Sequence, residues 1–82
     1  MNLAEWPVGA CARVVAVDAE QSMRLRMSEL GLRAGAVLHV TQRAAFGGRV
    51  VAIGAQRFAV DSQTATRIEI APVTTAEQGS GA

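Results

Sequence analysis

Short apolar runs separated by glycine-bearing turns constrain this chain more than any other feature of its sequence. The runs at 10–17, 36–43, 49–53, 57–60 and 67–70 are rich in β-branched residues. Runs of this length and composition, bounded by turn residues, are typical of strands. A small sheet removes its exposed edges by closing on itself, so the pattern predicts a small closed β-barrel of about five strands.

Alternation within the runs predicts which side chains face the core. In the run at 36–43, Leu38 and Val40 fall on one face and His39 falls on the other. Successive side chains point to opposite faces of a strand, so this run is predicted to be half buried. The two runs on either side of the Gly54 turn are predicted to form a tight hairpin.

One segment has a helical period instead. Met23, Met27 and Leu30 repeat at the i, i+4, i+7 spacing of one helix face, and Gly31 follows as a left-handed C-cap. The spacing therefore predicts one helix over 20–30, inserted after the first strand, with these three side chains on its apolar face.

Three polar residues are candidates for helix N-caps. Asp18 has Gln21 three residues later, which is the spacing of a capping box, and Ser22 is a rival cap for the same helix. Asp61 is predicted to cap a single helical turn that ends at Ala65.

The remaining helix surface carries Leu25, which lies opposite the apolar face and between Arg24 and Arg26. An apolar side chain in a polar rim is typical of a partner contact, whereas scattered exposed leucines and solvated basic faces are also common. Both interpretations stay open. The first predicts a partner-binding surface made of Met23, Arg24, Leu25, Arg26 and Arg33.

The length of 82 residues fits one domain. We predict a barrel over 1–70 and a flexible tail over 71–82, because the tail is small, polar and glycine-bearing. Before the first strand, Leu3 and Trp6 are predicted to plug one end of the core.

Charge and cysteine content exclude several classes of protein. All basic residues are arginine, and 8 of them against 7 acidic residues give a formal net charge of +1, too little for a dedicated nucleic-acid binder. No basic leader and no run of about 18 apolar residues is present, so neither a signal peptide nor membrane insertion is predicted. With Cys11 as its one cysteine, the chain forms no internal disulfide, which suits the cytoplasm.

The sequence lacks the sets of residues that catalytic and metal-binding sites require. His39 is the one histidine and Cys11 the one thiol, too few ligands for zinc. No nucleophile motif or phosphate-binding loop occurs, so we expect no enzyme, no catalytic residue, no metal site and no cofactor. The aromatic residues Trp6, Phe46 and Phe58 are predicted to serve core or turn packing, which leaves no groove for proline-rich peptides and few stacking platforms for RNA.

The order of these features resembles the FeoA family of bacterial ferrous iron uptake. The matching residues are Leu3, Trp6 and Gly9 at the opening, the stretch RMSELGLRAG at 26–35, and a closing pattern over 58–70. The family's pattern is an opening L..l..G, a helix ending L..LGL.PG and a closing iaL…A..I.V. Two departures are Met27 in place of a leucine and Ala34 in place of a proline.

This resemblance implies an SH3-like barrel in the cytoplasm that binds the cytosolic, GTPase-bearing part of a FeoB-like membrane transporter and holds no iron cofactor. An alternative is a regulatory domain associated with a DtxR-like metal-dependent repressor, since a similar domain ends such repressors. The initial methionine and the lack of a helix-turn-helix suggest a free-standing module. Glycine turns in small barrels permit strand exchange, so a weak homo-oligomer is a further expectation.

Overall fold

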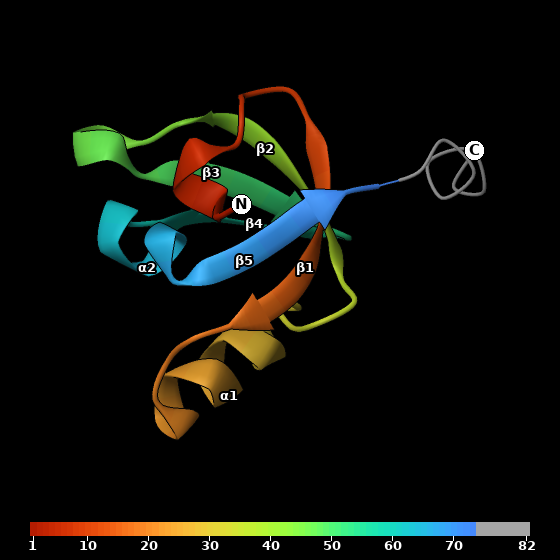
Figure 1. Cartoon of the computed structure of the whole chain (residues 1–82), viewed down its shortest axis with the longest axis vertical. Coiled ribbons are helices and arrows are strands. Elements are labelled where there is room, and N and C mark those ends of the chain that lie inside the picture. The colour runs from red at the N-terminus through yellow and green to blue at the C-terminus, as the bar shows by residue number, and fades with distance from the viewer. Residues whose placement is uncertain (74–82) are drawn as a thin grey trace.

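Five strands and one main helix follow one another much as the sequence predicts. The structure, a computed structural model, describes residues 1–73. Along the chain the elements are η1 (Leu3–Glu5), β1 (Cys11–Val17), α1 (Gln21–Glu29), β2 (Val37–Arg43), η2 (Ala45–Gly47), β3 (Arg49–Ile53), β4 (Gln56–Val60), α2 (Ser62–Thr66) and β5 (Ile68–Pro72). The predicted mainly β fold of five strands, with one helix inserted after the first, is confirmed (Figure 1).

The strands form one antiparallel sheet in the order β4-β3-β2-β1-β5. Within residues 1–73 no strand pairing joins β4 to β5, so the barrel is closed by packing and not by a complete hydrogen-bonded ladder. The short helix α2 connects these two edges, and its Ala65 is fully buried. The N-terminal residues cover part of the β5 edge, where the Ile70 N–H donates to the Met1 carbonyl at 2.8 Å.

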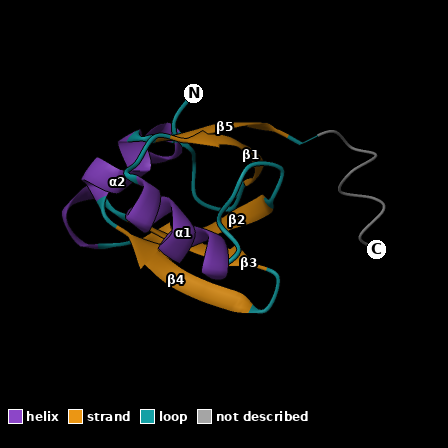
Figure 2. Cartoon of the chain, turned by 90° about the horizontal axis from the view of Figure 1, so that it is seen from below, coloured by secondary structure: helices purple, strands orange, loops and turns teal. Residues whose placement is uncertain are grey.

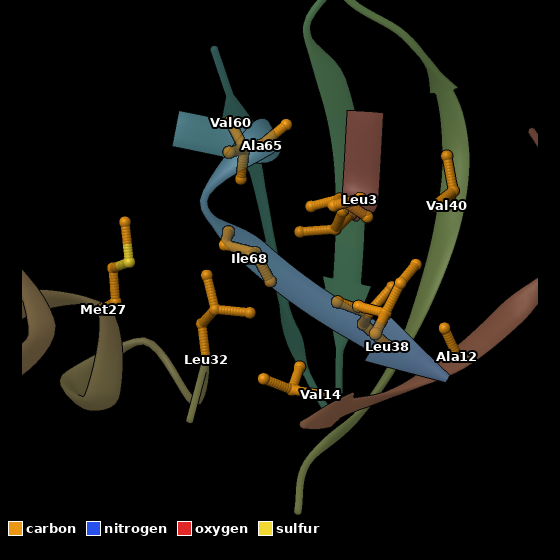
Figure 3. Packing of buried hydrophobic residues seen from close by; sticks show 12 residues of the cluster. Leu3, Ala12, Val14, Met27, Leu32, Leu38, Val40, Val60, Ala65 and Ile68 are labelled. Carbon is orange, nitrogen blue, oxygen red and sulfur yellow. The ribbon is translucent and has the colours of Figure 1, made fainter. Parts of the chain in front are cut away.

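The core fills the inside of the curled sheet (Figure 3). Leu38, Val40, Ile68 and Ile70 point inward as the alternation predicts, and Leu3 from η1 is fully buried, which confirms the predicted plug. Burial of such side chains contributes about 1.5–3 kcal/mol each relative to exposure. The complete cluster is Leu3, Ala12, Val14, Met27, Leu32, Leu38, Val40, Val51, Val60, Ala65, Ile68 and Ile70.

The Arg49 guanidinium ties the N-terminal plug to the β2–β3 turn. It donates to the carbonyl oxygens of Ala4 at 2.6 Å and of Gly47 and Gly48 at 3.0 Å each. A longer contact of 3.5 Å reaches the Trp6 carbonyl. Arginine presents several donors in a fixed fork, so one side chain braces segments that are distant in sequence.

A β-bulge interrupts the alternation of β1. The register with β5 shifts between Val14, which faces Ile70, and Ala16, which faces Glu69. The extra residue is Val15, and both it and Ala16 are exposed. A bulge turns side chains out of the regular pattern, which is why this part of an apolar run lies outside the core.

The helix α1 lies across one end of the barrel (Figures 1 and 2) and differs from expectation at its start. Its N-cap is Glu20, and no side chain caps it, so the predicted caps Asp18 and Ser22 are wrong. The prediction at its end is confirmed, because Gly31 has φ of 96° and the Leu32 N–H donates to the Met27 carbonyl at 2.8 Å. This bond pattern is a Schellman C-cap.

The predicted apolar face of α1 is only partly buried. Met27 is 7% exposed, whereas Met23 and Leu30 are 41% and 39% exposed. Because the helix spans the end of the barrel and does not lie flat on the sheet, only its innermost side chain reaches the core.

The C-terminal part of the barrel confirms the smaller predictions with one change. The Asp61 carboxylate accepts a hydrogen bond from the Thr64 N–H at 2.7 Å, and this caps α2. The hairpin of β3 and β4 turns at Gly54 as expected, with Ile53 opposite Gln56. The last strand extends to Pro72, so the predicted tail begins too early at 71, and its part at 74–82 lies outside the described residues.

Candidate protein-binding surface

The one thiol and the one imidazole of the chain are brought together by the fold. Cys11 and His39 are directly opposite each other in the β1–β2 register. Opposite residues project on the same face of a sheet, so strand pairing places these two side chains beside each other, which the sequence did not indicate. Zinc needs further ligands, and within residues 1–73 no group of three or more His, Cys, Asp or Glu side chains is assembled.

A groove lies on the surface between α1 and the bulged part of β1. We call it the α1–β1 groove; its volume is about 510 Å³. The β1 bulge supplies its apolar wall, because Val15 is turned outward there, and Leu25 of α1 faces it with 58% of its surface exposed. Its lining residues are Val15, Ala16, Val17, Gln21, Arg24, Leu25, Ser28, Arg33 and Ala34.

The opposite side of α1 forms a second hollow against β4 and α2. This α1–β4 groove has a volume of about 240 Å³ and is lined largely by apolar side chains, among them Met23, Leu30 and Phe58. Arg26 and Asp61 also line it. The exposure of Met23 and Leu30 follows from this groove, which leaves their outer surfaces open.

The structure therefore divides the predicted partner-binding residues between two grooves. Arg24, Leu25 and Arg33 line the α1–β1 groove, whereas Met23 and Arg26 line the α1–β4 groove. Arg24, Leu25 and Arg33 therefore share one groove surface, and Met23 and Arg26 share the other.

Charge distinguishes the two grooves. The α1–β1 groove carries two guanidinium groups, Arg24 and Arg33, and no carboxylate is among the described residues that line it. The α1–β4 groove combines Arg26 with Asp61. An apolar floor with a cationic rim fits an acidic protein segment that carries an apolar anchor.

The position of Phe46 differs from the prediction made from the sequence. It was predicted to pack in the core or the turn, yet its side chain is 98% exposed at the tip of the β2–β3 turn. Its φ of 55° lies in the left-handed region, which is uncommon for a bulky side chain. The signal for this lies in the sequence itself, where the phenylalanine stands among small residues, alanines before it and glycines after it.

Comparison with known proteins decides the family. A model of the FeoA domain matches residues 1–72. The chain belongs to the FeoA family. Membership places it among accessory proteins of ferrous iron transport, a family that is regulatory and is not known as enzymatic.

Solved FeoA structures have the same fold. FeoA from Chlorobium tepidum is 31% identical with a TM-score of 0.82, and the match covers 90% of this chain and 71% of that one. FeoA from Stenotrophomonas maltophilia, solved with zinc and described as an SH3 domain protein, is 29% identical with a TM-score of 0.71, over 87% of this chain and 89% of that one. These matches confirm the predicted SH3-like fold.

A more distant match shows the fold alone. A manganese-dependent transcriptional repressor is 23% identical with a TM-score of 0.76, over 89% of this chain but only 41% of the repressor. No curated protein sequence matches the chain. Among the described residues, no helix has the length and apolar character needed to cross a membrane.

Proposed function

We propose that this FeoA-family chain is a cytoplasmic accessory module that binds the cytosolic, GTPase-bearing part of a FeoB-like transporter and supports ferrous iron uptake. The observation that carries the proposal is the FeoA domain match across residues 1–72. The Stenotrophomonas relative is described as a candidate activating factor of bacterial ferrous iron transport, which supports the same role here.

The contact surface proposed for this role is the α1–β1 groove, with Leu25 as apolar anchor and Arg24 and Arg33 as its cationic rim. An apolar leucine in the groove and arginines at its rim provide the two components of a protein interface, a desolvated centre and a polar border. Met23 and Arg26 lie on the other side of α1 and would contact only a partner that encloses the helix.

A titration tests the proposal directly. The soluble GTPase-bearing domain of the cognate transporter is titrated with this chain in the nucleotide-free, GDP-bound and GTP-analogue-bound states by calorimetry. We expect saturable binding in at least one state. Absence of heat and of any co-migration in all three states would overturn the proposal.

The groove is tested by substitution. Leu25→Glu removes the anchor and adds a negative charge to a surface proposed to receive an acidic segment, so we expect affinity to fall at least 10-fold, about 1.4 kcal/mol. Val37→Thr is a matched control, because Val37 is 44% exposed and lines neither groove. Full affinity of a folded Leu25→Glu variant would remove the groove from the interface.

The repressor alternative shares the fold and differs in its partner. It predicts co-purification with a DNA-binding regulator and not with a membrane protein. The repressor match at 23% identity shows the fold alone, so the accessory role is the one we propose. The gene beside this one offers a simple discriminator, because the accessory role predicts that it encodes a membrane transporter with a GTPase domain.

A further inference from the structure

Phe46 occupies a position at which its ring adds no buried contact to the fold. Its φ of 55° and ψ of 38° place a bulky residue in the left-handed region, and 98% of its side chain is exposed. Glycine or asparagine adopts this conformation more readily, and a polar side chain there would be better solvated. A strained conformation that buries nothing within the monomer indicates a contact outside it.

The turn that carries Phe46 is held rigid. The Gly48 N–H donates to the Ala45 carbonyl at 3.1 Å, and the Ala44 N–H donates to the Gly48 carbonyl at 3.0 Å. Arg49 fastens the same turn to the N-terminal plug through its bonds to the Gly47, Gly48 and Ala4 carbonyls. The backbone that carries the ring is therefore fixed before any partner arrives, which reduces the backbone entropy lost on binding.

The charges around the tip favour a protein partner over a lipid surface. The tip packs near α2, where the Ser62 Cβ lies 3.5 Å from the position of a Cβ on Gly47, and the Asp61 carboxylate caps that helix. The Arg49 guanidinium donates its hydrogen bonds to backbone carbonyls. Arg43, opposite it on β2, is the other cation of this strand pair. Anionic membranes are bound by clusters of several basic side chains, which this tip lacks among the described residues.

The shape of the tip also disfavours a symmetric pair of tips. A phenylalanine ring buries about 150–250 Å², whereas a stable interface needs about 800 Å² from each partner. The neighbours Ala44, Ala45 and Gly47 are too small to supply the rest. A projecting ring of this kind fits a concave pocket on a larger surface.

We infer that Phe46, held on the braced β2–β3 turn, is an anchor that inserts into an apolar pocket of a protein partner. This inference rests on the function proposed above, under which the partner is the GTPase-bearing domain of the transporter. It adds a contact at a site separate from both grooves beside α1, because Phe46 lines neither of them.

Two substitutions separate the ring from the backbone. Phe46→Asn removes the ring and relieves the backbone conformation, so we expect binding to the GTPase-bearing domain to weaken about 30-fold or more while the melting temperature stays equal or rises. Phe46→Leu keeps an apolar side chain and should stay within a few-fold of the wild-type affinity. Loss of affinity together with retained stability is a combination that a purely structural role for Phe46 would not give.

Controls keep the outcomes distinct. Val37→Thr alters another exposed apolar side chain, outside the Phe46 turn, and should bind as the wild type does. If Phe46→Asn does not fold, Phe46→Gly replaces it, because glycine adopts this φ freely. Binding of the wild type with equal binding of folded Phe46→Asn would overturn the anchor alone, whereas no binding by the wild type would overturn the proposed function as well.

The same protein samples test whether Phe46 contacts a lipid surface or a second copy of the chain instead. Sedimentation of the wild type with phosphatidylserine vesicles, lost in Phe46→Asn, would overturn the inference in favour of a lipid surface. Concentration-dependent self-association of the wild type, lost in the same variant, would overturn it in favour of a second copy of this chain. Neither a Phe46-dependent lipid contact nor a Phe46-dependent self-association is expected.

Discussion

At the scale of single residues, glycine is required at position 48 because there is no room for a Cβ, and not because of the backbone conformation. Its φ of −72° is open to any residue, but a Cβ there would lie 2.7 Å from the Val60 carbonyl oxygen and 3.2 Å from the Ala44 Cβ. Gly48→Ala must therefore push backbone apart where η2 meets β4. We expect the free energy of unfolding to fall by about 1–3 kcal/mol, followed by Trp6 fluorescence in urea.

The matched control is the glycine of the β3–β4 turn. Gly54 has φ of 57°, and a Cβ at this position would have nothing within 4 Å, so Gly54→Asn meets no clash and suits a left-handed residue. Its unfolding free energy should stay within about 0.5 kcal/mol of the wild type. Equal stability of Gly48→Ala and Gly54→Asn would contradict the packing argument.

Asp61 makes a prediction about pH. The hydrogen bond from the Thr64 N–H lowers the pKa of this carboxyl from its ordinary 3.8. Because the folded pKa lies below the unfolded one, the stabilisation is present above the unfolded value and is lost as pH falls through the folded value. The melting temperature of the wild type should therefore drop relative to Asp61→Asn only below about pH 4, since asparagine caps without titrating.

The measurement is a pair of melting curves at each pH from neutral downward. Asp61→Ala serves as the control that lacks the cap at every pH and should melt below both other proteins at neutral pH. A wild-type-to-asparagine difference that stays constant as the solution is acidified through the carboxyl's titration range would show that the carboxyl does not act through its charge.

At the scale of elements, α1 is attached to the barrel through its inner side and its C-cap. Met27 is buried and adjoins Leu32 at the margin of the core (Figure 3). Met23 on the same helix is 41% exposed. Met27→Ala should cost about 2 kcal/mol or more of unfolding free energy, and Met23→Ala less than about 1 kcal/mol. Chemical denaturation of the two variants side by side measures the difference. Similar costs would mean that α1 packs with both methionines.

At the scale of the whole molecule, the core of the described residues is built within the segment from η1 to β5. All its members lie between Leu3 and Ile70, and the last strand ends at Pro72. We therefore propose that the barrel, predicted over 1–70, is an independent folding unit once extended through β5. A chain that ends at residue 73 should keep its melting temperature within about 2 °C and retain partner affinity, because it keeps every member of the described core. A large loss of stability would assign the final residues to the fold.

Local features of the sequence determined the five strands, the hairpin at Gly54, the C-cap at Gly31 and the Asp61 cap. Each depends on periodicity or turn chemistry within a few residues, so no distant contact is needed to predict it. The same local order carried the resemblance to the FeoA family.

Tertiary structure alone decided how these elements meet. The bulge at Val15 turns an apolar residue out of the core, and the placement of α1 across the end of the barrel leaves Met23 exposed. Strand register brings Cys11 beside His39, and the Arg49 brace holds Phe46 in solvent. These outcomes depend on pairing between distant segments, and local alternation carries no information about which segments pair or where a register shifts.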